Sequence, residues 1–291
     1  MDFYLTALLQ GLCLSAMALG IYISMKIFNI PDITTNGSYT LGAAVTAILL
    51  IHQQPVYIVL PAVILAGGIA GALTGIIHTK LEINPLLAGI LVMTALYAVN
   101  LTVMGRSNLP LINISSLFTL INISEKPNQN TFWILSSFVI IITSIIGYLL
   151  KTDFGIAMRA TGNSESMIRS LGVNTDRMKI TGLALANALT AMSGYLISQY
   201  QGFTDVSMGT GIVVIGLGSV IIAETFINWF RVTSVWVGLI LVLAGAVIFQ
   251  LVLAVTLDIG VDANLLTLVT AVFVLLIVSL PRLSFKGSNL K

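Results

Sequence analysis

Long apolar runs with almost no charge dominate this chain of 291 residues. Most reach the ~20 residues that a helix needs to cross the apolar core of a bilayer. Barrel strands would instead alternate within segments of ~10 residues. We therefore predict an all-α, polytopic membrane bundle, one domain over residues 1–291. We place about nine spans at 4–24, 38–52, 57–77, 85–104, 131–150, 179–200, 209–227, 234–256 and 264–280.

The scarcity of charge excludes several classes of protein. Charged residues make up 8% of the chain, whereas a soluble domain carries roughly 25%. The net charge is only +2, and no basic cluster dense enough for nucleic-acid binding occurs. Cys13, His52 and His78 stand apart from one another, so we expect no metal site on this chain. A Walker A phosphate loop is also missing from the sequence.

Two segments look interrupted. The span at 38–52 is short and follows Pro31, Asn36 and Gly37, which predicts a broken or re-entrant helix. The stretch 201–228 is interrupted by glycines at 202, 209, 211, 216 and 218. Interrupted helices in comparable places of two halves often mark the translocation site of a transporter.

Small residues recur every four positions in two spans. One series is Gly67, Gly71 and Gly75, and the other is Gly182, Ala186, Thr190 and Gly194. Such stripes let helix backbones approach closely in lipid. They predict close helix packing, either within one subunit or at a dimer seam.

Basic residues orient the spans. With the N-terminus outside and the C-terminus in the cytoplasm, only Arg106 and Lys126 lie outside. The other eleven lie inside, which is a strong positive-inside bias; they are Lys26, Lys80, Lys151, Arg159, Arg169, Arg177, Lys179, Arg231, Arg282, Lys286 and Lys291.

The largest predicted internal loop, residues 151–178, has its own local signals. Thr161-Gly162 breaks the chain, Asn163 can cap a short helix, and Gly172 is placed to end it. Met167, Ile168 and Leu171 then share one side of that helix. This pattern fits a docking element for a soluble partner and, equally, an ordinary solvated basic loop.

The same loop resembles the coupling loop of ABC-importer permeases of the branched-chain amino acid and ribose type. The resemblance rests on about 30 residues, although Ser166 and Met167 stand where the family has alanines. The matching residues are Gly155, Ala157, Arg159, Ala160, Gly162 and Asn163, then Glu165, Ser166 and Met167, then Gly172, Val173 and Asn174. A second phrase, residues 216–224, is similar to one found in tryptophan/tyrosine (aromatic amino acid) transport permeases.

The resemblance implies a permease subunit that carries a small solute, with an amino acid as the expected cargo. Its implied partners are two ABC ATPase subunits, an extracytoplasmic substrate-binding lipoprotein and a second permease subunit in a homodimer. ATP and Mg would bind to the ATPases, so we expect no cofactor and no enzymatic activity on this chain. The implied location is the bacterial cytoplasmic membrane. Branched-chain amino acids, sugars and nucleosides remain alternative cargoes.

Polar residues within or beside the apolar spans are candidates for the substrate pathway. An unpaired amide in hydrocarbon costs roughly 4–8 kcal/mol, so each should face the interior of the bundle. Glu224 could contact a substrate amine or pair with Arg231, and the amides could equally link helices. The candidates are Asn36, Asn84, Asn100, Asn187, Glu224 and Gln250.

Two other classes of protein compete with this interpretation. A self-contained secondary transporter or channel would need buried, repeated ionisable groups, and Glu224 alone does not provide them. A membrane enzyme would need a catalytic constellation. His52, His78, Asp258 and Asp262 do not form one in sequence.

Overall fold

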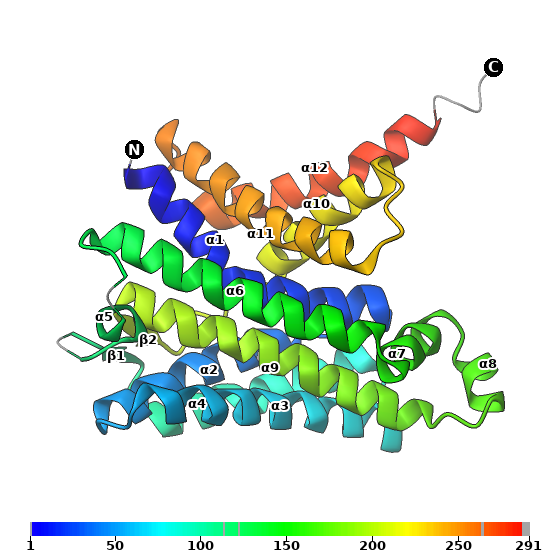
Figure 1. The fold of residues 1–291 in the computed structure, drawn as a ribbon. Helices are drawn as coiled ribbons and strands as arrows, with labels where there is room; N and C mark the ends of the chain where they lie inside the picture. The colour runs from blue at the N-terminus through cyan, green and yellow to red at the C-terminus, as the bar shows by residue number, and fades with distance from the viewer. Residues whose placement is uncertain (1, 113, 122, 263–264, 287–291) are drawn as a thin grey trace.

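The computed structural model describes residues 2–112, 114–121, 123–262 and 265–286. Nine long helices of these residues form one bundle (Figure 1), and each overlaps one of the nine predicted spans. They are α1 (Asp2–Ile21), α2 (Thr34–Ile51), α3 (Val56–Lys80), α4 (Pro85–Met104), α6 (Pro127–Lys151), α9 (Thr175–Gln201), α10 (Ile212–Trp229), α11 (Val235–Asp258) and α12 (Leu266–Lys286). The predicted all-α membrane bundle is therefore confirmed.

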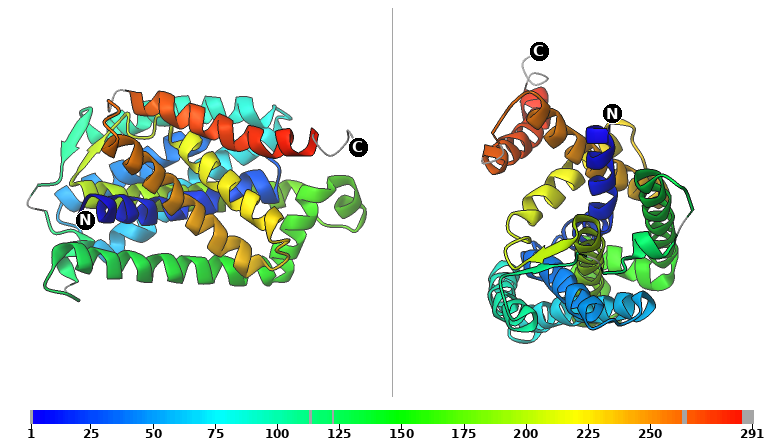
Figure 2. Two further views of the ribbon diagram at one scale, coloured as in Figure 1. Left: turned by 90° about the horizontal axis from the view of Figure 1, so that it is seen from above. Right: turned by 90° about the vertical axis from the view of Figure 1, so that its left-hand side faces the viewer.

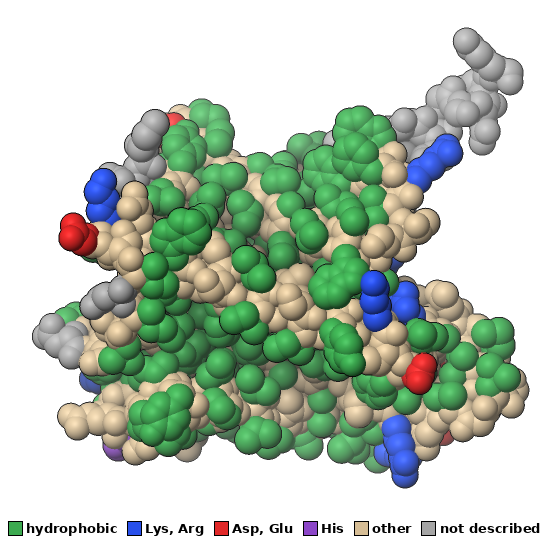
Figure 3. Space-filling model, viewed as in Figure 1, with side chains coloured by type: hydrophobic (Ala, Val, Ile, Leu, Met, Phe, Trp, Pro, Cys, Tyr) green, Lys and Arg blue, Asp and Glu red, His purple; other side chains and the backbone are tan. Residues whose placement is uncertain are grey.

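Seven of the nine are long and apolar enough to cross a membrane by themselves. The first of these spans joins α1 to a π-helical turn, η1 (Tyr22–Ile27), and covers Phe3–Ile27. The other six are α3, α4, α6, α9, α10 and α11. Hydrophobic side chains cover the middle of the visible face, and charged ones gather toward its two ends (Figure 3). The chain is thus a multi-pass membrane protein.

Short elements mark the two ends of the bundle (Figure 1). At one end lie α7 (Asp153–Asn163) and α8 (Glu165–Ser170). At the other, β1 (Asn108–Pro110) pairs antiparallel with β2 (Phe203–Asp205), beside the short helix α5 (Leu117–Leu120). We call these the α7–α8 end and the hairpin end. The N-terminus lies at the hairpin end (Figure 1).

Helix α9 is largely buried, and α3 packs along it. The glycines of α3 permit this approach, because a Cβ at Gly71 would overlap the Leu183 carbonyl oxygen of α9. A Cβ at Gly75 would lie 2.7 Å from the Cα of Ile180. On α9 itself, a Cβ at Gly194 would overlap the Tyr39 carbonyl of α2. The small-residue stripes therefore serve packing within the chain at these positions.

The first interruption lies before α2 rather than inside it. Helix α2 runs unbroken over Thr34–Ile51, so the expected short span at 38–52 is wrong at its start. The break is formed by η1 and residues 28–33, where Asn29 adopts a φ of 54°. Polar residues at 34–40 concealed this helical turn from a hydropathy pattern, although their side chains are mostly buried.

The second interruption agrees with the sequence. After α9, the chain forms β2, returns through residues 206–211 and begins α10 at Ile212. Gly211 adopts a φ of 79°, a left-handed conformation that glycine enters without strain. The glycines therefore mark the turn, whereas Gly216 and Gly218 lie within the helix.

The 151–178 loop contains one more helix than we expected. Thr161 and Gly162 do not break the chain, because α7 continues through them to Asn163. Ser164, not Asn163, occupies the N-cap position of α8. Gly172 follows the end of α8 with a φ of 84°, as its predicted role as a helix terminator requires.

Candidate functional site

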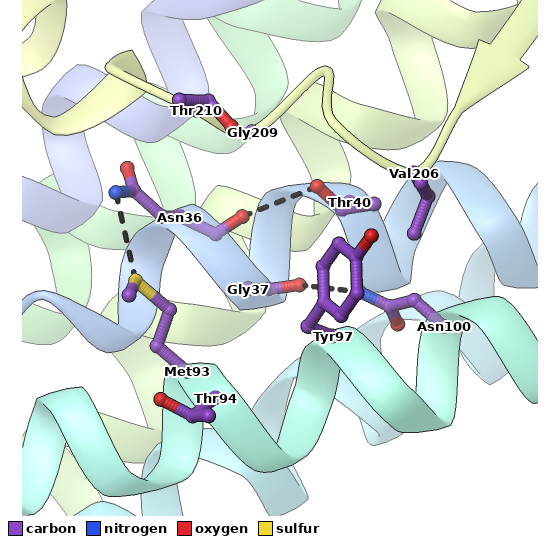
Figure 4. Close-up of a pocket in the computed structure, with 10 residues that line it drawn as sticks. All are labelled: Asn36, Gly37, Thr40, Met93, Thr94, Tyr97, Asn100, Val206, Gly209 and Thr210. Atoms are coloured by element: carbon purple, nitrogen blue, oxygen red, sulfur yellow. Dashed lines mark hydrogen bonds between the residues drawn. The ribbon is translucent and has the colours of Figure 1, made fainter. Parts of the chain in front are cut away.

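A cavity of about 290 Å³ opens where the start of α2, the middle of α4 and the returning loop 206–210 meet (Figure 4). Its lining is mainly apolar. The ten lining residues are Asn36, Gly37, Thr40, Met93, Thr94, Tyr97, Asn100, Val206, Gly209 and Thr210. The cavity thus lies at the junction of the two interrupted segments that the sequence predicted.

Asn36 links these two segments directly. Its Oδ1 accepts a hydrogen bond from the backbone N–H of Val213 in the first turn of α10, at 3.1 Å. Among the described residues, the acceptor of its Nδ2 is the thioether sulfur of Met93, at 3.7 Å, and a thioether is a weak acceptor. A Cβ at Gly209 would overlap the carbonyl oxygen of Asn36, so only glycine permits the loop to pass this close.

Asn100 closes the cavity on α4. Its side chain is buried, and its Nδ2 donates to the Gly37 carbonyl at 3.2 Å. Within the described part of the chain, its Oδ1 has no hydrogen-bond partner. An unsatisfied buried acceptor costs roughly 1–3 kcal/mol. Tyr97 lies three residues before it, on the same face of α4, and its side chain is 54% exposed.

A buried polar cluster lies deeper, around Asn187 of α9. The Asn187 Nδ2 donates to the Asp32 carboxylate at 2.7 Å, and its Oδ1 accepts from the Ser38 hydroxyl at 2.7 Å. Asp32 also accepts from the backbone N–H of Thr34 at 2.8 Å. Asn187 thus has a structural role here: it connects α9 to the break before α2.

Asp32, which is only 2% exposed, was not among the candidates predicted from the sequence. It lies in the break between η1 and α2, outside the nine predicted spans. The available signal was its position: Asp32 follows Pro31 between two apolar segments.

The remaining candidates lie away from the cavity. Asn84 is exposed and caps α4 by accepting from the Leu86 N–H at 2.9 Å. Glu224 pairs with Lys26 at 3.1 Å rather than with Arg231. Gln250 lines a second cavity of about 380 Å³, which also includes Asp205. Of the six candidates, the structure brings only Asn36 and Asn100 together.

The 151–178 loop touches the break before α2. A Cβ at Gly162 would overlap the carbonyl oxygen of Ile27. The Asn29 Nδ2 donates to the Gly162 carbonyl at 3.1 Å. Gly155 makes a similar approach at the α6–α7 turn, against the backbone of Leu149 and Leu150. These glycines are therefore explained by close backbone contacts.

Ion pairs of Glu165 stabilise α8 and attach it to α9. Glu165 pairs with Arg169 at 2.9 Å and with Lys179 of α9 at 2.6 Å. The hydrogen bond from Lys179 is the main cause that lowers the pKa of Glu165 below its usual value. Ile168 is buried, whereas Met167 and Leu171 are exposed by 54% and 71%.

The other loop residues are divided between structural contacts and open surface. The Arg159 guanidinium donates to the Leu150 carbonyl at 3.2 Å. Asn174 caps α9 by accepting from the Arg177 N–H at 3.0 Å. Asn163, Ser166 and Gly172 are exposed, and Val173 is half-buried.

Comparison with known proteins places the chain. A family model described as the branched-chain amino acid transport system permease component matches residues 3–279. A tyrosine transport system permease protein of Clostridioides difficile is 38% identical over 290 residues, covering 99% of this chain and 95% of that protein. The ribose import permease protein RbsC of Haemophilus influenzae is 22% identical, covering 67% of this chain and 60% of that protein.

The fold has a solved counterpart. An ABC transporter described as of the metal-chelate type, in an inward-facing conformation, aligns with a TM-score of 0.52. The alignment covers 96% of this chain and 83% of that one, at 16% identity. The chain belongs to the branched-chain amino acid transport system permease family, and is therefore the membrane-spanning permease component of an ABC transporter.

Proposed function

We propose that two copies of this chain form the transmembrane translocation pathway of an ATP-driven importer in a bacterial cytoplasmic membrane. Two ATPases would bind at the α7–α8 end, and a substrate-binding lipoprotein would deliver the solute at the hairpin end. This orientation puts the N-terminus outside and the C-terminus in the cytoplasm. The cargo would be an amino acid of the aromatic class, supported by the tyrosine transport permease that is 38% identical.

The observation that carries the proposal is the construction of α8. Met167 of α8 and Leu171, the residue that ends it, are exposed, while Ile168 is buried and Glu165 is paired to α9. A short helix with an exposed apolar side, attached to a long helix by ion pairs, is suited to dock in a groove of a soluble partner. ATP and Mg would be bound by that partner.

Co-purification and uptake together test the proposal. Detergent extraction of the tagged chain from its own host should bring down an ABC ATPase, and Met167→Asp should abolish that association. Proteoliposomes with the ATPase and the binding protein should accumulate tyrosine only with ATP on the ATPase side. Uptake by the chain alone, without ATP, would instead support a secondary transporter.

The matched control is Leu65→Ala. Leu65 is exposed on α3, far along the chain from the loop, and its loss should leave the ATPase bound. Export of tyrosine on addition of ATP would contradict the proposed direction.

A further inference from the structure

We propose that the cavity between α2, α4 and residues 206–210 is a selective binding site for an amino acid with an aromatic or large apolar side chain. This inference rests on the proposed function and deepens it: the permease itself would discriminate among solutes, in addition to the binding protein. The observations that carry it are the size and chemistry of the cavity and the unused hydrogen-bonding groups at its wall.

The size of the cavity limits the ligand. Its volume of about 290 Å³ lies just below the roughly 300–1,000 Å³ found for small-molecule sites. A single amino acid is therefore of suitable size, whereas a peptide is not.

The lining excludes net charge. None of the ten lining side chains carries a formal charge. A solute such as lysine or glutamate would lose its hydration without gaining a counter-charge, which is unfavourable in a mainly apolar site. An amino acid with a neutral side chain brings balanced charges, and its apolar part is matched by Met93, Val206 and the ring of Tyr97.

Two groups on the wall lack a good partner and are opposite in type. Asn36 offers a donor, since within the described part of the chain its Nδ2 donates to a sulfur atom alone, at 3.7 Å. Asn100 offers an acceptor, since its Oδ1 is unpaired among the described residues. We assign the carboxylate of the ligand to the Asn36 side, beside the positive N-terminal end of α10, and its ammonium to Asn100.

Tyr97 controls access to Asn100. The Asn100 Oδ1 is enclosed in this conformation, and Figure 4 shows the ring of Tyr97 beside the Asn100 amide group. Because Tyr97 is half exposed, its ring can turn aside to admit the ammonium and then stack on an aromatic side chain. Stacked aromatic pairs favour ring centroids about 4.5–7 Å apart.

Binding of radiolabelled tyrosine to the detergent-purified permease, without the binding protein, tests this site. Unlabelled phenylalanine should compete, whereas lysine, glutamate and ribose should compete at least about tenfold less well. Asn100→Leu and Tyr97→Ala should each weaken binding about tenfold or more, the loss that about 1.4 kcal/mol produces. Tyr97→Phe keeps the ring and should bind within about threefold of the native chain, a difference below 0.7 kcal/mol.

The control is Thr102→Ala. Thr102 is exposed on α4, and its hydroxyl donates within its own helix to Ala98 at 2.8 Å. Native binding by both Asn100→Leu and Tyr97→Ala would overturn the site, as would equal competition by ribose and lysine. ATPase co-purification is measured on the same variants. Its retention alongside unchanged tyrosine binding would remove the cavity site but leave the importer assignment intact.

Discussion

The α-carbon of Gly162 rests directly against the carbonyl group of Ile27, with Asn29 bonded to the Gly162 carbonyl at 3.1 Å. This contact joins α7 to the break that precedes α2. From there, residues 28–33 lead to Asn36 and the cavity. We therefore expect a displacement of α7 to be passed to the cavity through this short stretch of backbone.

We predict that Gly162→Ala uncouples ATP hydrolysis from transport. The added methyl group would overlap the Ile27 carbonyl and force the two backbones apart, an overpacking that typically costs about 1–3 kcal/mol. Uptake per ATP hydrolysed should fall several-fold while the ATPase still co-purifies. Thr181→Ala is the control, because the hydrogen bonds of this exposed hydroxyl to the described residues stay within α9. Unchanged uptake by Gly162→Ala would show that this contact does not transmit motion.

We predict that Asp32 and Asn187 stabilise the fold as a coupled pair. Asp32→Ala would leave the buried Nδ2 of Asn187 without its 2.7 Å acceptor, at a cost of about 1–3 kcal/mol. Thermal unfolding in detergent should show a lower Tm. Asn187→Leu in the same chain should then cost less than it does alone, since contacting residues typically show coupling of about 0.5–3 kcal/mol. Strict additivity of the two changes would contradict the pair.

A third prediction separates two roles for Glu224. If its function is the ion pair with Lys26, Glu224→Lys should lower uptake, and Lys26→Glu in the same chain should restore it. The stability effect should stay below about 1 kcal/mol, because both side chains are partly exposed. If Glu224 instead contacts a substrate amine, the double exchange would fail to restore uptake.

The attachment of α8 should depend on pH in a defined direction. The pKa of Glu165 is lowered in the folded chain, chiefly by Lys179. The stabilisation that the ionised Glu165 carboxylate gives to the folded chain is therefore complete above its unfolded pKa of about 4.3. This stabilisation is lost as the pH falls through the lower pKa of the folded chain. We expect faster hydrogen exchange over residues 164–174 below about pH 4, after correction for the intrinsic rate, but no change between pH 7 and 5.

Glu165→Gln is the matched variant. It should already show the faster exchange at pH 7, by a factor equivalent to at most about 1 kcal/mol for a partly exposed pair. A Gln variant that retained the full acid dependence would assign the effect to another group.

Hydropathy predicted the nine helices well, because most are defined by the same physical requirement of apolar length, which seven of them meet in full. Hydropathy failed where residues are polar and nevertheless buried. Residues 34–40 are polar yet buried against neighbouring helices, and the start of α2 was therefore placed four residues late. Asp32 was overlooked for the same reason.

The site could be predicted only in part. Asn36 and Asn100 were identified because an amide in an apolar span requires a partner, but the partners themselves depend on tertiary packing. That is why Asn187 belongs to a structural cluster and Asn84 is a helix cap. Tyr97 carried no distinguishing signal, since an aromatic residue in a membrane helix is ordinary. Gly162 looked like a helix breaker, and only the neighbouring Ile27 backbone explains it.

The interlocked contact of α3 with α9 has a mechanical consequence. Gly67, Gly71 and Gly75 receive the backbone of α9 at successive turns, so sliding one helix along the other by a fraction of a turn would drive main-chain atoms into each other. We expect the two helices to move together as one rigid unit during the transport cycle. Helices α10, α11 and α12 lie on the opposite side of the bundle from α3 (Figure 2), and α10 and α11 pack mainly on each other and on α1. We therefore expect any tilting within the subunit to be larger in that layer.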